Sequence, residues 1–290
     1  MSAALLIEQL LNGLITGSMY ALVAAGLALI YGTLRILNFA HGEFFMLGGF
    51  GLVSALSLAW SPWLAVPAAG VAVAVVGLLI YRSVLEPLAR QGGNAFPTIA
   101  ATLGLSIFLQ NFALRVFGEQ YLSAPYFVDG MFEFAGIRLP AQRLLIVAAA
   151  CVALGLAWAL LRCTRFGRAV RATALDAEAA QVCGVPVGRV RAATFALGTL
   201  MAGVAGAMLA PIYAVNPWMG VPVLLKAFVV VVMGGLGSFS GAVIAGLLLG
   251  VVEAVGVSLT SSEWRDLIAY VVLLVVVWFR PWGLFGVAER

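Results

Sequence analysis

The chain has 290 residues, of which 63% are apolar and 10% are charged, and its formal net charge is +4. Soluble domains average about 45–50% apolar and about 25% charged residues, so this composition excludes a soluble fold and a disordered chain. The positive excess lies between apolar runs, which is typical of membrane topology and argues against a nucleic-acid partner. The sequence predicts an all-α polytopic membrane protein with a single transmembrane domain over residues 1–290.

Apolar segments follow one another along the whole chain, separated by polar residues, glycine or proline. A bilayer-spanning helix uses about 20 residues, so we expect a bundle of about eight to ten transmembrane helices. The expected spans cover residues 9–32, 38–59, 62–82, 96–117, 143–162, 192–213, 222–235, 239–257 and 265–280. The seventh is short and ends in Gly234-Gly235-Leu236-Gly237-Ser238, which favours a broken or re-entrant helix.

Small residues recur at every fourth position of the first expected span, at Gly13, Gly17, Ala21 and Ala25. The eighth span carries the pattern Gly246-x-x-x-Gly250. Membrane helices approach closely at such positions. The pattern therefore predicts close helix packing and does not identify a transport path.

Polar residues inside apolar spans are costly in lipid and tend to face a cavity or a partner helix. At the start of the second span, Asn38, His41 and Glu43 are candidates for a gate or, alternatively, for capping a helix. In the fourth span the polar residues lie on one helix face, because they are spaced by four. They are Thr98, Thr102, Ser106 and Gln110, with Asn111 beside them.

We take Asn38, His41, Glu43, Thr102, Gln110 and Asn111 as candidate residues of a translocation pathway or gate. Interhelical hydrogen bonding is the simpler explanation for the threonines. The bulkier amides of Gln110 and Asn111 are the better candidates for the pathway.

The segment 162–191 is the most basic part of the chain, with six arginines against two acidic residues. The segment 118–141 has three acidic residues and one arginine. Because cytoplasmic loops carry the excess of basic residues, we expect 162–191 to be cytoplasmic. With nine crossings, the C-terminus is then cytoplasmic and the N-terminus lies outside.

Within the basic segment, residues 175–184 read as a short helix that ends at Gly184, before Pro186. An exposed helix in a protein that is otherwise embedded in lipid indicates docking to a soluble partner. A solvated loop that only sets the topology is the alternative.

Lys226 and Glu253 are the two charges that lie most clearly inside apolar segments. On consecutive antiparallel helices each would lie about 6 Å below the outer surface. Pairing would reduce the cost of burying either charge. The alternative is that Lys226 extends outward to water along its flexible stem.

The inventory of reactive residues argues against an enzyme. Lys226 is the only lysine and follows a leucine, so the Gly-Lys of a phosphate-binding Walker A loop is absent. His41 is the only histidine, and the three cysteines lack metal-binding spacing. We expect no metal site and no cofactor, and any ATP must be hydrolysed by another polypeptide.

Several motifs resemble one family of transport proteins. Glu178, Ala179, Ala180 and Gly184 match the EAA-x-x-x-G motif of the permease subunits of ABC importers. Asn38-Phe39-Ala40-His41-Gly42-Glu43, Lys226-Ala227-Phe228 and Pro281-Trp282-Gly283-Leu284-Phe285-Gly286 are similar to segments of the branched-chain amino acid permeases. The resemblance extends over nearly the whole chain.

The resemblance implies a non-catalytic permease of the bacterial inner membrane that imports branched-chain amino acids by alternating access. It also implies a homologous second permease, two ATP-binding subunits and a periplasmic substrate-binding protein as partners. The motif at Glu178–Gly184 would be the segment that couples to the ATPase. Related permeases carry urea, amides or aromatic acids, and a secondary carrier or channel is the alternative from another class.

The predicted topology can be tested by cysteine labelling. Single cysteines at Ala3 and at Asp176, in a cysteine-free background, should react with an impermeant reagent from opposite sides of the membrane. Labelling of both from the same side would contradict nine crossings.

Overall fold

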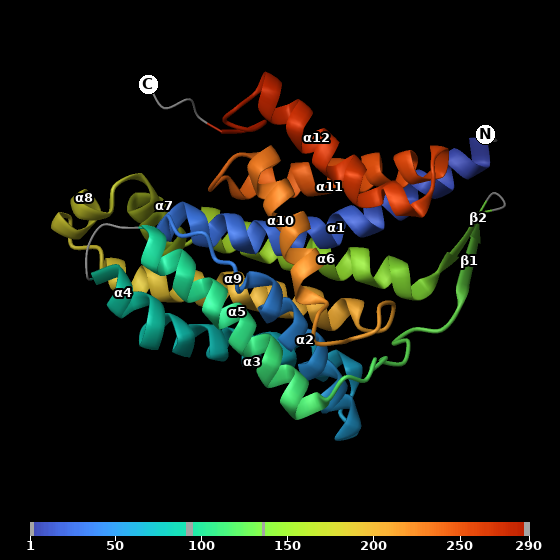
Figure 1. Cartoon of the computed structure of the whole chain (residues 1–290), viewed down its shortest axis with the longest axis horizontal. Helices are drawn as coiled ribbons and strands as arrows, with labels where there is room; N and C mark the ends of the chain where they lie inside the picture. The colour runs from blue at the N-terminus through green and yellow to red at the C-terminus, as the bar shows by residue number, and fades with distance from the viewer. Residues whose placement is uncertain (1–2, 91–94, 135–136, 287–290) are drawn as a thin grey trace.

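The computed structural model describes residues 3–90, 95–134 and 137–286, and it forms an elongated bundle of helices (Figure 1). Its main helices are α1 (Ala3–Leu34), α2 (His41–Ser57), α3 (Pro62–Ile80), α5 (Ala95–Phe117), α6 (Ala141–Cys163), α9 (Val187–Leu209), α10 (Gly220–Gly234), α11 (Phe239–Leu259) and α12 (Arg265–Phe279). The shorter elements are a π-helical turn (Tyr81–Leu85), α4 (Glu86–Arg90), the strands β1 (Met131–Phe134) and β2 (Ile137–Pro140), α7 (Arg165–Leu175), α8 (Ala177–Val182) and a 3-10 turn (Ser262–Trp264).

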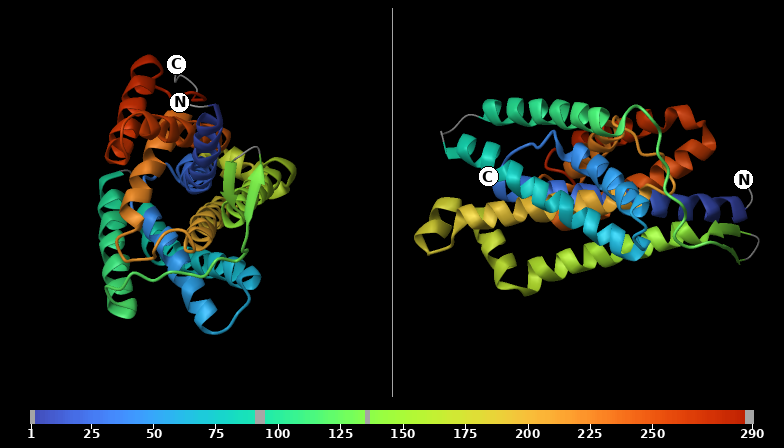
Figure 2. Two further views of the ribbon diagram at one scale, coloured as in Figure 1. Left: turned by 90° about the vertical axis from the view of Figure 1, so that its right-hand side faces the viewer. Right: turned by 90° about the horizontal axis from the view of Figure 1, so that it is seen from below.

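The two ends of the bundle differ in what they carry. Helix α8 lies at one end of the long axis, and the first turns of α1 lie at the other end with the β1–β2 hairpin (Figure 1). Seen along that axis, α1 and α9 run inside the bundle, whereas α5, α6 and α12 lie at its edge (Figure 2). The outward faces of these edge helices are apolar, as a bilayer requires, with Ile107, Phe108, Leu156 and Leu274 all exposed.

Each of the nine expected spans is helical, but the helices differ in length. Within the described residues, six are long and apolar enough to cross a membrane, namely α1, α3 with its extension, α5, α6, α9 and α11. Helices α2, α10 and α12 have only 17, 15 and 15 residues. The chain is therefore a polytopic helical membrane protein, and eight to ten is an approximate number of spans. The two chain ends, residues 1–2 and 287–290, lie outside the description.

The β1–β2 hairpin and helix α7 are among the elements that were not predicted. The hairpin pairs Met131 with Pro140 and Phe132 with Leu139 in antiparallel register. Its strands have only four residues each, so their alternation was too short to distinguish from a loop. Helix α7 was missed because its arginines indicated topology, although their spacing of three residues places them on one exposed helix face.

Helix α2 begins inside the bundle and not at its end. After α1, the chain turns back at Arg35, whose φ is 55°, and α2 starts at His41 in the interior (Figure 1). The side-chain oxygen of Asn38 accepts a hydrogen bond from the Ala40 amide at 3.1 Å. This bond satisfies a backbone group outside any helix, which a buried break in a membrane protein requires.

Glycines bring the inner helices into backbone contact, as the small-residue pattern predicted. A Cβ atom on Gly250 of α11 would lie 2.4 Å from the Cα of Gly17 on α1. The same is true where α2 crosses α9, since a Cβ on Gly48 would lie 2.0 Å from the Gly203 oxygen. These crossings leave no space for a side chain, so they fix the positions of α1, α2, α9 and α11.

Gly250→Ala should therefore lower the apparent melting temperature of the purified protein. The added methyl group forces α1 and α11 apart, and such overpacking typically costs about 1–3 kcal/mol. Gly104→Ala on α5 is the matched control, because a Cβ there meets no atom within 4 Å. The control should be neutral or stabilising, since alanine favours a helix over glycine by about 1 kcal/mol. Equal melting temperatures for the two variants would contradict the close contact.

Candidate functional site

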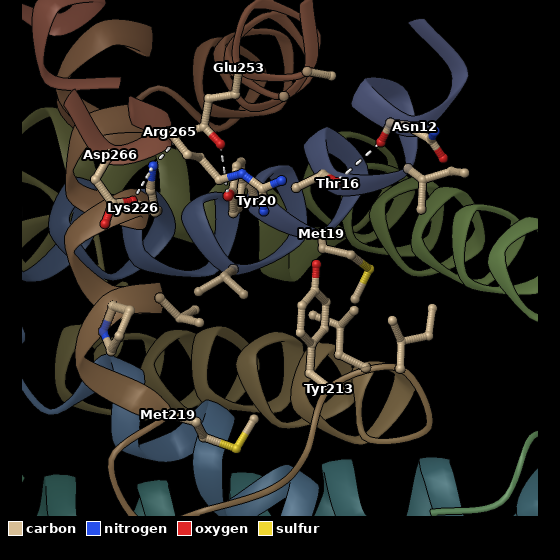
Figure 3. Close-up of a pocket in the computed structure, with 18 of the residues that line it drawn as sticks. Asn12, Thr16, Met19, Tyr20, Tyr213, Met219, Lys226, Glu253, Arg265 and Asp266 are labelled. Carbon is tan, nitrogen blue, oxygen red and sulfur yellow. Dashed lines mark hydrogen bonds and ion pairs between the residues drawn. The ribbon is translucent and has the colours of Figure 1, made fainter. Parts of the chain in front are cut away.

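A cavity of about 560 Å³ is lined by residues of the first half of α1, which lies in the half of the bundle remote from α8 (Figure 1), and Figure 3 shows its lining. This volume is within the range of roughly 300–1,000 Å³ that is usual for small-molecule sites. Its walls come mainly from α1, α10, α11, the first residues of α12 and the connection from α9 to α10. The site is thus built by helices that are far apart in the sequence.

The cavity has apolar and polar parts. The apolar lining includes Met19 of α1, Phe45 of α2, Met219 before α10 and Val223 within α10. The polar and charged lining comprises Gln9, Asn12, Thr16, Tyr20, Arg143, Tyr213, Asn216, Lys226, Glu253, Arg265 and Asp266. A cavity of this kind suits a small molecule with a charged head and an apolar tail.

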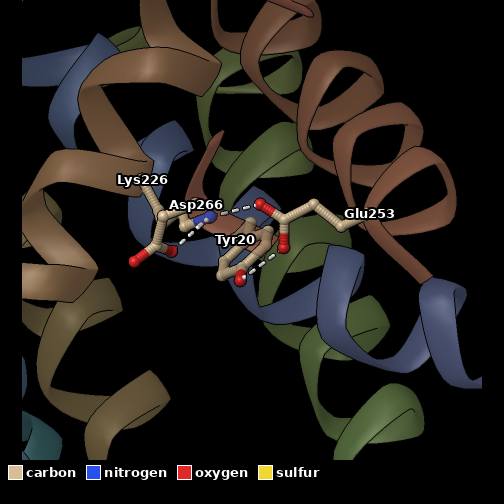
Figure 4. Close-up of polar contacts among 4 residues, drawn as sticks. All are labelled: Tyr20, Lys226, Glu253 and Asp266. Carbon is tan, nitrogen blue, oxygen red and sulfur yellow. Dashed lines mark hydrogen bonds and ion pairs between the residues drawn. The ribbon is translucent and has the colours of Figure 1, made fainter. Parts of the chain in front are cut away.

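Lys226 and Glu253 are in contact in the structure, through the ammonium group and Oε1 (Figure 4). The Lys226 ammonium also lies 3.0 Å from Oδ1 of Asp266, and the Tyr20 hydroxyl donates a hydrogen bond to Oε2 of Glu253 at 3.0 Å. The side chains of Lys226 and Glu253 are only 7% and 2% exposed, so neither extends to water. Charges buried to this extent are stable only when they are paired and hydrogen-bonded.

Tyr20 and Asp266 were not among the residues selected from the sequence. Asp266 is 72% exposed and is the second residue of α12, so it resembles any acidic residue in the first turn of a helix. Tyr20 lies in an apolar span, where its hydroxyl group was the only available signal. Both became recognisable only when the fold brought them to Lys226 and Glu253.

Two arginines of the cavity are not paired with a carboxylate among the described residues. The guanidinium of Arg143 donates a hydrogen bond to Oδ1 of Asn12 at 2.6 Å. Arg265 extends its guanidinium toward Tyr20 and Thr16, along the cavity wall (Figure 3). The cavity thus holds cations that are available to an anionic group.

The first turn of α2 borders the inner end of the cavity. Nε2 of His41 lies 3.0 Å from the carbonyl oxygen of Val23, and Val23 lines the cavity. Because a carbonyl only accepts hydrogen bonds, this ring nitrogen carries the hydrogen. Asn38, His41 and Glu43 are at most 1% exposed, yet Nδ2, Nδ1 and Oε2 of these residues have no hydrogen-bond partner among the described residues.

The polar face of α5 reaches the same region. Ser106 donates a hydrogen bond to Oε1 of Glu43 at 3.1 Å, and Thr102 donates to the carbonyl of Leu37 at 3.3 Å. Gln110 lies one turn further along this face and is half-buried. Asn111 does not join them, because it is exposed and bonds to the Ile107 carbonyl of its own helix at 2.8 Å.

The motif of Glu178, Ala179, Ala180 and Gly184 lies on α8 and the turn after it, at the opposite end of the bundle. Asp176 caps the start of α8, because Oδ1 accepts hydrogen bonds from the amides of Glu178 and Ala179 at 2.9 and 3.0 Å. At its end, the Gly184 amide donates to Gln181 and the Val185 amide to Ala180, both at 3.0 Å, and Gly184 has a φ of 83°. This Schellman arrangement explains the glycine, since a residue with a side chain is strained at that φ.

The surface of α8 is exposed, although it contains large apolar side chains. Leu175, at the end of α7, and Val182, the last residue of α8, are 87% and 89% exposed, whereas Ala180 is buried. A cavity of about 720 Å³ lies next to it, lined by Gln181, Arg82, Arg189 and Arg191. This end of the bundle therefore exposes large apolar side chains beside a cavity that is lined by arginines.

Lys226→Ala and Glu253→Ala should each reduce the yield of folded protein, because each leaves a buried charge unpaired. Removing one partner of a buried ion pair typically destabilises the folded state by about 3–5 kcal/mol. The double variant should lose less than the sum of the two losses. Glu263→Ala, at an exposed residue near the start of α12, is the control and should leave the yield unchanged. Additive losses, measured by fluorescence-detected size-exclusion chromatography, would contradict the pair.

Comparison with known proteins identifies the family. Residues 9–277 match the family model described as branched-chain amino acid transport system / permease component. The chain is 35% identical to the high-affinity branched-chain amino acid transport permease BraD of Pseudomonas aeruginosa, and 36% identical to LivH of Escherichia coli. Each alignment covers 98% of this chain and 96% of the relative.

The solved structure of PsaBC from Streptococcus pneumoniae in complex with Fab shares the fold. Its TM-score is 0.52 at 15% sequence identity, and the match covers 94% of this chain and 92% of that one. The chain is a member of the permease family of branched-chain amino acid transport systems.

Proposed function

We propose that the chain is the transmembrane subunit of an ATP-driven importer that carries branched-chain amino acids across the bacterial inner membrane. The observation that carries this proposal is the arrangement of the two ends of the bundle. One end holds a cavity with a charged and an apolar part, and the other presents α8 for docking. A channel or secondary carrier has no ATP-binding subunit to dock, so an exposed α8 would have no function in it.

The lining of the cavity supports an amino acid with an apolar side chain as the substrate. Met19, Phe45, Met219 and Val223 offer an apolar surface, and charged residues line the same cavity. Urea and simple amides have no apolar tail to place there, so they fit this lining less well. The printed names of BraD and LivH point to the same class of substrate.

The first turn of α2 is, in this proposal, the gate at the inner end of the cavity. An unpaired buried polar atom costs about 1–3 kcal/mol, and three of them occur at Asn38, His41 and Glu43. In this proposal, these atoms gain hydrogen-bond partners in another state of the transport cycle, which offsets the cost of burying them here. Thr102 and Gln110 lie on the α5 face that contacts this turn, whereas Asn111 is exposed and bonds only to its own helix, so we leave it out of the gate.

The partners of the chain are inferred from its lack of a phosphate-binding loop and from its exposed helix α8. Its one lysine is buried in the ion pair, so this chain has no phosphate-binding loop and two separate ATP-binding subunits supply the energy. We assign α8 to the contact with one of them, with a homologous second permease and a substrate-binding protein completing the importer. The α8 end is then cytoplasmic, and the cavity opens toward the periplasm in this state.

Glu178→Arg and Gly184→Trp should leave the protein inserted in the membrane but reduce uptake of leucine at least tenfold. The first reverses a charge on the docking surface, and the second strains the turn that ends α8. Transport should be measured in proteoliposomes that contain the whole importer, and co-purification of the ATPase should fall in parallel.

Glu119→Arg is the matched control, because Glu119 is an exposed glutamate just beyond the last residue of α5 and lies far from α8. It should transport leucine at the rate of the unmodified protein. Normal uptake by both α8 variants would show that this helix does not couple to the ATPase.

A further inference from the structure

We propose that Arg265 binds the α-carboxylate of the amino acid in the cavity and so selects substrates that carry a free carboxylate. This inference rests on the proposed function and assigns one of the recognition groups within it. Three lines of observation carry it: the charges of the cavity, the direction of the Arg265 side chain, and the placement of the apolar lining.

The charges of the cavity are not balanced among themselves. Its described lining has three cations, Lys226, Arg143 and Arg265, and two carboxylates, Glu253 and Asp266. Both carboxylates are engaged by Lys226, and the second oxygen of Glu253 accepts the Tyr20 hydroxyl. The lining by itself has a net charge of +1, so a carboxylate is favoured beside a cation that has no acidic partner there.

Arg265 is the better placed of the two remaining cations. Arg143 already donates to Asn12 at 2.6 Å, whereas no hydrogen bond or ion pair of Arg265 occurs within the described part of the chain. Its planar guanidinium can donate two parallel hydrogen bonds to one carboxylate, which a lysine cannot do. Arg265 is also the first residue of α12, where a cation is unfavourable for the helix dipole, so helix stability does not explain it.

The shape of the cavity agrees with this assignment. Arg265, Tyr20 and Thr16 lie along one side, and Tyr213 and Met219 lie along the other (Figure 3). A carboxylate held at Arg265 would leave the side chain of the amino acid directed toward Met219 and its apolar neighbours. Asp266, next in the sequence, contacts Lys226 through Oδ1, and its second carboxylate oxygen would accept a hydrogen bond from the substrate ammonium group.

Transport by the whole importer in proteoliposomes, at saturating substrate-binding protein, gives the first test. Arg265→Gln should lower the maximal rate of leucine uptake about tenfold to a hundredfold, as expected for the loss of a charged hydrogen bond. ATP hydrolysis stimulated by the binding protein should change less than twofold, because docking at α8 is untouched. Arg265→Lys, which keeps the charge, should recover part of the rate.

Arg115→Gln is the matched control, since Arg115 is an exposed arginine in the last turn of α5 and lies outside the cavity. It should transport normally. Equal uptake by Arg265→Gln and Arg115→Gln would overturn the inference and leave the proposed function intact. A lack of ATP-dependent leucine uptake by the unmodified importer would instead contradict the proposed function.

Direct binding tests the chemistry even if Arg265→Gln folds poorly. The purified importer without its binding protein should be stabilised against thermal unfolding by leucine at millimolar concentration. Leucinamide, in which a neutral amide replaces the carboxylate, should stabilise it at least tenfold more weakly at equal concentration. Arg265→Lys should show a smaller preference for leucine. Equal stabilisation by both compounds in the unmodified protein would overturn the assignment, as would a lack of stabilisation by either.

Discussion

The close contact between α1 and α11 is the constraint on which the remainder of the structure depends. Glycines on both helices allow the two backbones to touch, with Gly17 and Gly250 leaving no space for a side chain. This approach brings Tyr20 of α1 within hydrogen-bonding distance of Glu253 on α11. A polar cluster in the wall of the cavity is therefore a consequence of packing between residues that have no side chains at all.

The ion pair of Lys226 and Glu253 adds a specific geometry to this packing. A buried ion pair contributes little net stability, because desolvation offsets most of the attraction. Its effect here is to select one arrangement of α10, α11 and α12, since Lys226 contacts Glu253 on α11 and Asp266 on α12. Any other rotation of α10 would leave a charge unpaired in an apolar environment, which is much more costly than the pair itself.

Helix α9 connects the two functional ends of the proposed importer. It starts at Val187, directly after the turn that closes α8, and ends at Leu209, which lines the cavity. Its 23 residues span about 35 Å at 1.5 Å per residue. A continuous, tightly packed helix moves as a unit, so a displacement of α8 would reach the cavity without passing through flexible segments.

The sequence by itself determined the class of the protein, the order of its apolar helices and the small-residue positions at which they touch, because these follow from composition and local periodicity. It also indicated Lys226, Glu253 and the motif at Glu178, since buried charges and exposed short helices are unusual in a membrane protein. Only the tertiary structure decided that α2 starts in the interior, that the α5 face with Thr102 is buried and the face with Asn111 exposed, and that Tyr20, Arg265 and Asp266 join one cavity. The physical reason is that the rotation of each helix about its axis depends on contacts with helices that are distant in the sequence.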